Sequence, residues 1–222
     1  MFHVKHIASV LLLCFPFWSM GQSVFKLNDI PFVHQSPLDT SLVDYISTQT
    51  KGRGLTETEL GVYYWTNYVR KNPIAFLNTV LQPFLKAFPE AKGVESASLE
   101  ADLKALPSLP LLKFSPLLQD AALYHANDLT QQGSGLSHSS SKGLSFAQRM
   151  KLAGITGCAA ENLYTGKNDG LLPVLMLLLD IGLTPPGHRK NLMNSNYTAI
   201  GLSIRPNKDA SSIVLVQDFG CY

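Results

Sequence analysis

The stretch PPGHRKNLMN, residues 185–194, places His188 after a double proline and Gly187, and directly before a second basic residue, Arg189. Ahead of it, Leu171 to Leu179 are almost all apolar, a composition typical of a helix that is buried on every side. Gly182 and the two prolines interrupt that helix. His188 therefore lies just after the point where a predicted buried helix ends.

Two further phrases each contain one residue that suits a functional site. SHSSSKGLSFAQRM, residues 137–150, contains His138, and CAAENLYTG, residues 158–166, contains Glu161. Two imidazoles and a carboxylate in one site can hold a metal ion, shuttle a proton or hydrogen-bond a loop in place. Which of these applies decides whether the protein is an enzyme.

Local signals elsewhere predict several helices and few strands. Thr56-x-x-Glu59 is a capping box that begins a helix, and Asn72-Pro73 interrupts or kinks it. Ser115-Pro116 begins another helix, which ends at Gly133. By similar reasoning we expect helices within 74–88 and 93–110 and over 116–132, 146–153 and 171–179, and strands over 199–205 and 211–219 that form a closing hairpin. This pattern favours the α+β class or a layered α/β/α arrangement.

The first 21 residues are typical of a secretory signal. Lys5 supplies the positive start, Ile7 to Trp18 is a short apolar run, and small residues occupy the two positions that a signal peptidase reads. The run is shorter than the roughly 18 apolar residues of a membrane-spanning helix. We expect cleavage before Gln22 and export to the periplasm or the exterior, with no membrane span afterwards. A retained anchor is the alternative.

Charge and length exclude some classes of protein. Removal of Lys5 with the signal lowers the formal charge from +2 to +1. No Lys/Arg cluster provides the basic patch of a nucleic-acid-binding protein, so we expect no nucleic-acid partner. About 200 residues remain, enough to bury one core. We expect a signal at 1–21, a loosely ordered leader or linker at 22–54, where periodicity is lacking, and one domain at 55–222.

Cys158 and Cys221 remain once the signal is removed. In an oxidising compartment an even pair favours a disulfide. Closing a loop of that length would stabilise the fold by about 3–4 kcal/mol in the chain-entropy model. Two buried thiols that do not meet are the alternative, and the sequence leaves both open.

In their order and intervals, the phrases resemble the CAP superfamily (cysteine-rich secretory, antigen 5, pathogenesis-related; also called SCP-like), and in particular its bacterial branch. The resemblance runs from about Thr56 to Phe219. It rests on YVRKNPIAF, LLQDAALYHANDL, His138 with Gly143 and Arg149, AENLYTG, GHRKNLMN, YTAIGLS and VQDFG. It implies a three-layer α–β–α sandwich with a central cleft, lined by His138, Glu161 and His188.

The eukaryotic relatives have a second acid in that cleft, after a tryptophan. Here the corresponding helix ends LLLD without the tryptophan, so Asp180 is the candidate for this place. Its alternative is a polar residue that merely ends an apolar helix. Arg149 and Arg189 are candidates to hold the cleft walls by pairing with Glu161 or Asp180.

The candidate residues allow two kinds of chemistry. Imidazoles with a carboxylate are a known ligand set for zinc, so His138 and His188 are candidate metal ligands, with Zn a possible but not a required cofactor. They lack the His-Glu-x-x-His spacing that would aim both rings at one ion. Alternatively, Glu161 and His188 form a charge-assisted pair, which is structural or, in an enzyme, catalytic. His125 shares an apolar helix face and is expected in the core.

We therefore expect a secreted CAP-like domain whose cleft binds a small ligand, a lipid or a metal ion, as a binding or interaction module of the cell envelope or exterior. One alternative is a secreted hydrolase, protease-like, that uses His138, Glu161 and His188 with a metal or as acid and base. Another is an envelope interaction protein whose 22–54 leader contacts the partner.

Overall fold

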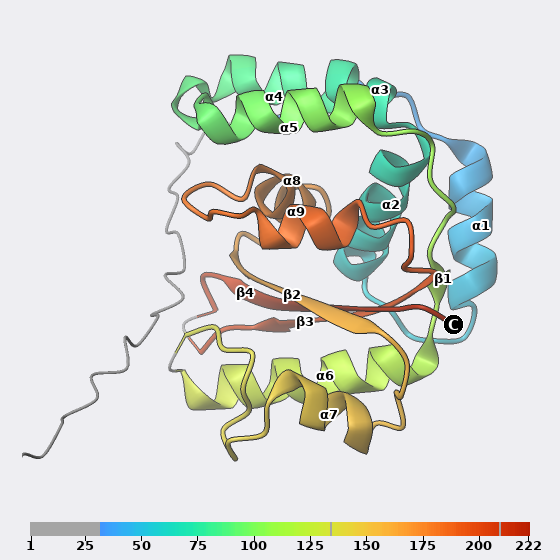
Figure 1. The fold of residues 1–222 in the computed structure, drawn as a ribbon, viewed down its shortest axis with the longest axis vertical. Helices are drawn as coiled ribbons and strands as arrows, with labels where there is room; N and C mark the ends of the chain where they lie inside the picture. The colour runs from blue at the N-terminus through green and yellow to red at the C-terminus, as the bar shows by residue number, and fades with distance from the viewer. Residues whose placement is uncertain (1–31, 134, 209) are drawn as a thin grey trace, which may run out of the picture.

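A four-stranded sheet separates the helices of this molecule into two groups (Figure 1). The computed structural model describes residues 32–133, 135–208 and 210–222. The strands lie in the order β1-β3-β4-β2. Their bounds are Lys113–Phe114 for β1, Ala159–Gly166 for β2, Ala199–Pro206 for β3 and Ile213–Gly220 for β4. Only the short β1 runs parallel to its neighbour.

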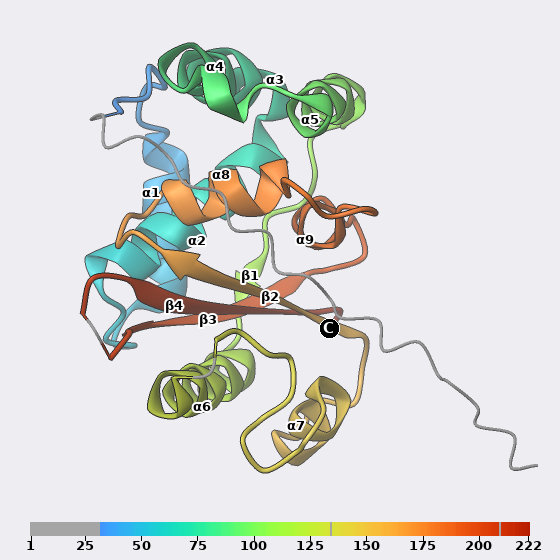
Figure 2. The ribbon, with the colours of Figure 1, turned by 90° about the vertical axis from the view of Figure 1, so that its left-hand side faces the viewer.

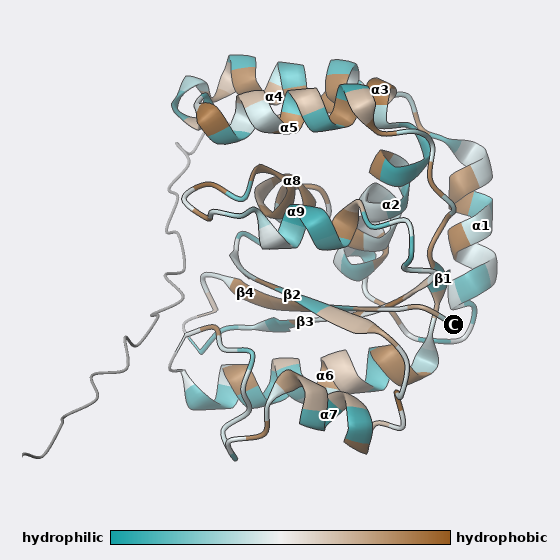
Figure 3. Cartoon of the chain, viewed as in Figure 1, coloured by the Kyte–Doolittle hydropathy of each residue, from teal (hydrophilic) through white to brown (hydrophobic). Residues whose placement is uncertain are grey.

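Helices cover both faces of the sheet, which confirms the expected α–β–α sandwich (Figures 1 and 2). One face is covered by α6 (Pro116–Gln132) and α7 (Phe146–Leu152). The other is covered by α2 (Glu57–Lys71), α8 (Leu172–Leu179) and α9 (Gly187–Leu192). Beyond these lie α3 (Pro73–Phe76), α4 (Gln82–Ala87) and α5 (Val94–Ala105). Figure 3 shows α8 as the most uniformly apolar helix, and it lies between the sheet and the pair α4 and α5.

The local start and stop signals act as predicted. Thr56 and Glu59 form the reciprocal capping box of α2, and Ser115 caps α6, which ends at Gly133 in the left-handed conformation. Asn72 has a non-helical backbone (φ −132°, ψ 60°), so Asn72-Pro73 interrupts the helix and a second apolar helical segment follows. Within that segment a π-helical turn, Leu77–Leu81, separates α3 from α4. A 3₁₀ turn, Pro89–Ala91, then leads toward α5.

Two strands were not predicted. β1 has only two residues, too few for a periodic pattern. In β2, the residues Glu161, Asn162 and Leu163 are all buried, so polar and apolar residues do not alternate as they do on a strand with one wet face. Its polar side chains are instead satisfied by neighbouring elements.

The expected loosely ordered leader is wrong for residues 40–50, which form helix α1 (Thr40–Thr50). Leu42 and Ile46 are 0% and 5% exposed and belong to the main core. Upstream of α1, the ring of Phe32 packs edge-on against Phe84, with 5.4 Å between centroids. The apolar stripe of α1 is narrow, one residue per turn, which is why periodicity did not reveal it. The expected signal and residues 22–31 lie outside the described residues.

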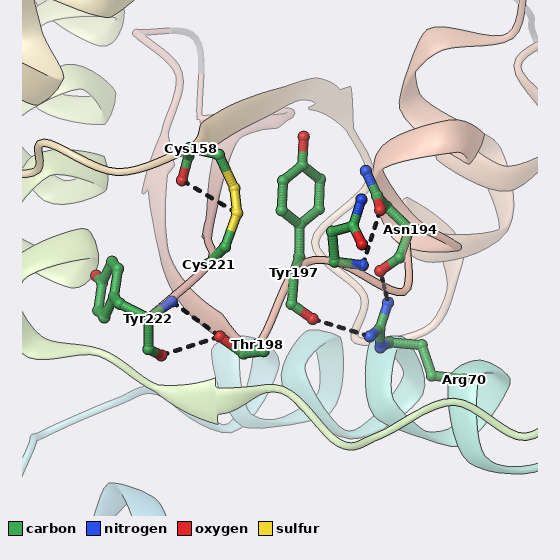
Figure 4. Close-up of a disulfide and its surroundings, with 8 residues drawn as sticks. Arg70, Cys158, Asn194, Tyr197, Thr198, Cys221 and Tyr222 are labelled. Atoms are coloured by element: carbon green, nitrogen blue, oxygen red, sulfur yellow. Dashed lines mark hydrogen bonds between the residues drawn. A yellow bond between two sulfur atoms is a disulfide. The ribbon is translucent and has the colours of Figure 1, made fainter.

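Arg70 holds the segment that follows α9 against α2 (Figure 4). Its fully buried guanidinium donates to the carbonyl oxygens of Leu192, Asn194 and Tyr197 at 2.9–3.1 Å, and to Pro110 at 3.2 Å. Burial lowers the pKa of Arg70 to about 10. These bonds fix the end of α9, and with it the position of His188.

Cys158 and Cys221 form a disulfide, with Cα atoms 5.6 Å apart (Figure 4). The bond joins the residue before β2 to the residue after β4, next to the paired ends Ala159 and Gly220. Of the two alternatives that the sequence left open, the structure has the cross-link. Within the described part of the chain, no helix combines the length and apolar character needed to cross a bilayer.

Candidate functional site

Glu161 gathers the first group of polar residues, on the sheet face covered by α6 and α7. Its side chain is 1% exposed. Arg149 of α7 donates from Nη2 to Oε1 and Oε2 of Glu161, at 2.7 and 2.6 Å. His138 Nδ1 lies 2.8 Å from Oε1, and Arg149 also donates to the carbonyl oxygen of His138 at 3.1 Å. One guanidinium thus holds both the carboxylate and the loop that carries the imidazole.

The loop around His138 is also tied to α6. His125 Nε2 lies 2.8 Å from the carbonyl oxygen of Ser137. One turn later, Asp128 accepts from the backbone N–H of Ser141 at 2.8 Å and from its hydroxyl. Burial raises the pKa of Asp128, but the hydrogen bonds from Ser141, together with smaller effects of His125 and Gln132, make the net shift downward. The ring of His138 therefore projects from a loop that is held on both sides.

Asp180 and His188 form the second group. Asp180 ends α8 in the left-handed conformation (φ 54°), and its buried carboxylate accepts from the backbone N–H of His188 at 2.9 Å and of Arg189 at 3.3 Å. His188 Nδ1 lies 2.6 Å from Asp180 Oδ1. Asp180 therefore does more than end an apolar helix, because it also contacts a candidate histidine.

The hydrogen bonds assign the protons of the three rings. Carboxylate and carbonyl oxygens only accept, so Nδ1 of His138, Nδ1 of His188 and Nε2 of His125 carry the hydrogen. The side chains of His138 and His188 are 45% and 23% exposed, and no described residue hydrogen-bonds their Nε2 atoms. Each Nε2 is thus free to meet a ligand.

The two groups lie on opposite faces of the edge strand β2. Successive side chains of a strand point to opposite faces, so Glu161 faces α7 while Asn162 faces α9. Asn162 donates to the carbonyl oxygen of His188 at 3.3 Å, and Asn191 donates to Asn162 Oδ1 at 2.8 Å. Asn191 also reaches the carbonyl oxygen of Glu161, at 3.4 Å. β2 therefore connects the groups without merging them.

Two expected pairings differ in the structure. Glu161 does not pair with His188, because its oxygens are engaged by Arg149 and His138, while His188 has its own acid. The predicted pairing of Arg149 with Glu161 is present. Arg189 does not line a cleft: it is 2% exposed, and its side chain donates to acceptors on α5 and α8, among them Leu178 O at 2.7 Å and Asp102 Oδ2 at 2.9 Å.

Sequence reasoning missed Asp218, which faces Glu161 across the β2–β4 ladder and is fully buried. The signal was present: an acid inside IVLVQDFG, a strand otherwise suited to burial, needs a polar partner. His125 was expected in the core and is fully buried. Burial, partly offset by the nearby Glu161 carboxylate, lowers the pKa of His125, so its ring is neutral at pH 7.

The side chains present do not fit the zinc site that the sequence left possible. Among the described residues, no three His, Cys, Asp or Glu side chains are grouped so that they could hold a metal ion. The Glu161 carboxylate is covered by the Arg149 guanidinium, a cation that would repel another. The two candidate ligands, His138 and His188, approach β2 from opposite faces.

Two surface grooves lie away from these groups. One, of about 570 Å³, runs between α4 and α5 and is bordered by Lys86, Lys92 and Lys104. The other, of about 770 Å³, lies between α1 and α2 and is more apolar, with Leu38 and Val43 on its rim. Neither groove is lined by His138, Glu161 or His188.

Comparisons with known proteins found one matching family model and two similar solved structures. The model of the CAP family, described as the cysteine-rich secretory protein family, matches residues 63–219. No curated protein matches the chain. An extracellular protein with an SCP domain from Bacillus anthracis is 23% identical with a TM-score of 0.44, and the match covers 57% of this chain and 38% of that one. An outer surface protein of Borrelia burgdorferi is 20% identical with a TM-score of 0.40, over 57% of this chain and 88% of that one.

This chain thus corresponds to well under half of the Bacillus protein. The family match is the stronger finding, since it spans the helices and strands that hold His138, Glu161, Asp180 and His188 in place. The chain belongs to the CAP, or cysteine-rich secretory protein, family.

Proposed function

We propose that this CAP protein is exported and binds small ligands through the Nε2 atoms of His138 and His188, which act separately because the two rings lie on opposite faces of β2. The observation that carries the proposal is that each exposed imidazole is fixed through Nδ1 on its own buried carboxylate. A ring held in this way presents Nε2 in one direction, so little conformational entropy is lost on binding. Export rests on the signal-like first 21 residues.

The protonation of the rings selects the class of ligand. With the hydrogen on Nδ1, a neutral imidazole offers a lone pair at Nε2 and accepts from a donor. The proposed ligand therefore carries hydroxyl or amide N–H groups, as sugars and other polyols do. Because Glu161 and Asp180 are occupied by internal donors, neither carboxylate contributes a free charge to that ligand.

One observation favours an acid/base hydrolase as a second candidate. Asp180 lies 2.6 Å from Nδ1 of His188 and leaves Nε2 free, the arrangement in which an acid orients a general base. In this version Glu161 has no catalytic part, because Arg149 neutralises it. The catalytic pair would be His188 and Asp180, with a nucleophile or water supplied at Nε2.

The test is an NMR titration of the mature protein with a panel of monosaccharides, glycerol and simple amides, observing the imidazole Cε1–H signals. We expect at least one compound to shift the signals of His138, of His188 or of both, and the shifts to vanish in the variants His138→Gln and His188→Gln. His34, whose ring packs edge-on against Trp65 with 4.6 Å between centroids, is the internal control and stays unshifted.

Two outcomes would contradict the binding proposal. If no compound shifts either signal, Nε2 is not a binding atom for donors of this class. If the wild type hydrolyses a p-nitrophenyl ester or casein and Asp180→Asn abolishes this while Glu161→Gln does not, the hydrolase is the correct function.

A further inference from the structure

Asp218 is a buried acid that the proposed function does not use. It is fully buried on β4, and neither of its carboxyl oxygens accepts a hydrogen bond from an N–H or O–H donor of a described residue. Buried carboxyl groups without donors are rare, because burying an unpaired charge costs several kcal/mol. Its environment must therefore satisfy it in another way.

The sheet register shows what surrounds Asp218. Gly201 of β3, Asp218 of β4 and Glu161 of β2 form one row across the sheet, on the face that α6 covers. At Gly201 the helix lies so close that a Cβ atom would overlap the backbone of Leu118 and Gln119. The next row on this face, Leu163 and Val216, is apolar and buried. Water is therefore excluded on three sides of Asp218.

On the fourth side Asp218 lies directly opposite Glu161 in the β2–β4 register, and both side chains point to the face that α6 covers. Directly opposite residues of an antiparallel pair have Cβ atoms about 4.5–5.5 Å apart. Two ionised carboxylates only accept, and they repel each other at this distance. A close carboxyl pair therefore holds one proton between its two groups.

The charged groups around the pair decide which acid keeps the proton. Arg149 is the cation that faces it, and its hydrogen bonds go to Glu161 and to His138 O, none to Asp218. On α6, His125 is neutral, and Asp128 lies one turn further along the helix. From the loop after α6, His138 contacts Glu161. Glu161 is thus the ionised member. Burial, and then the charge of Glu161, raise the pKa of Asp218, while Arg149 offsets part of this.

We propose that Asp218 is a carboxylic acid that donates its O–H to Glu161 and so acts as a positioning residue for the His138 imidazole. Glu161 then receives hydrogen bonds from Asp218 behind it, from Arg149 beside it and from His138 in front. A carboxylate with all these donors cannot rotate away from the ring, and it cannot serve as a base or a metal ligand. This inference is independent of the proposed ligand, because its test uses none.

The test compares the wild type with Asp218→Asn, which has nearly the same size and keeps a neutral N–H donor. The unfolded chain releases the Asp218 proton near pH 4, whereas the folded chain retains it, so the wild type loses stability as pH rises above about 4. The variant has no such loss. We expect the folding equilibrium constant of Asp218→Asn, relative to the wild type, to rise about tenfold or more between pH 5 and pH 7 in urea unfolding.

Asp128→Asn is the matched control. The net downward pKa shift of Asp128 confines its titration to lower pH. The folding equilibrium constant of Asp128→Asn, relative to the wild type, should therefore stay constant between pH 5 and pH 7. A constant or falling ratio for Asp218→Asn would show that Asp218 is ionised, and the proposal would be wrong.

Infrared spectroscopy at pH 7 locates the proton directly, whatever the variants do to stability. We expect the carbonyl band of a protonated carboxylic acid in the wild type and in Asp128→Asn, and its loss in Asp218→Asn. A wild-type spectrum without the band, or a band that survives in Asp218→Asn, would overturn the assignment.

Discussion

His138 and His188 are chemically equivalent as residues, and what distinguishes them is the acid that each one meets. His138 contacts Glu161, whose charge is shared with Arg149, while His188 contacts Asp180 without a cation among its side-chain partners. The phrases of the sequence predicted that these histidines and acids are site residues, and they offered Glu161 as a partner of Arg149. The sequence could not predict that Glu161 pairs with His138 and Asp180 with His188, because these pairs depend on the face of β2 to which each side chain points.

Gly201 shows how a single residue sets the distance between α6 and β3. Gly201→Ala would place a methyl group inside the backbone of α6, at Leu118 and Gln119. We expect a loss of about 3 kcal/mol in the free energy of unfolding, measured by urea titration, because helix or strand must move apart. Gly157→Ala is the control, since its nearest neighbour would be Cys221 O at 3.8 Å, and we expect a change within about 0.5 kcal/mol. Equal effects would contradict the close approach.

At the scale of elements, the helices with strong local signals are those that the sequence predicts. The capping boxes of α2 and α7 and the Ser-Pro start of α6 act within one turn, so they do not depend on the rest of the fold. β2 has no such signal, and α1 has only the cap at Asp39, whose carboxylate accepts from the backbone N–H of Leu42. β2 is buried with polar side chains, and α1 is held by a narrow apolar stripe and by contacts with α2.

The packing of α1 leads to a prediction for the segment expected to be a leader. Leu42→Ala removes a side chain that is fully buried in the main core. We expect it to lower the free energy of unfolding by about 2–5 kcal/mol in urea titration. Val43→Ala, on the outer rim of the same helix, should cost less than about 1 kcal/mol. If Leu42→Ala is silent, α1 is a separable leader, and the interaction protein that uses residues 22–54 regains support.

At the scale of the whole molecule, the disulfide and the pairing of the strands fix the elements that carry the site residues. The bond between Cys158 and Cys221 lies at the end of the β2–β4 ladder, on which Glu161 and Asp218 are also paired. Arg70 and Arg189 fix α9 from two other directions, through carbonyl oxygens of the 192–197 segment and of α8. The positions of both histidines therefore depend on contacts between distant parts of the chain.

Removing the cross-link tests this dependence. The double variant Cys158→Ser/Cys221→Ser frees a loop with a sequence separation of 63 residues. The chain-entropy model gives a loss of about 4 kcal/mol in the free energy of unfolding. Urea unfolding of the wild type with and without dithiothreitol should show the same difference. An unchanged midpoint under reducing conditions would mean that the ladder alone holds these ends.

By itself, the sequence determined the class of fold, the start and end of the capped helices, the closing hairpin and the three phrases that contain His138, Glu161 and His188. These depend on signals within a few residues, or on their order along the chain. Only the tertiary structure decided that the histidines have separate acids, that Arg189 is internal and that Asp218 lies behind Glu161. The physical reason is that burial and strand register bring together groups far apart in sequence, and no local pattern encodes which of them will meet.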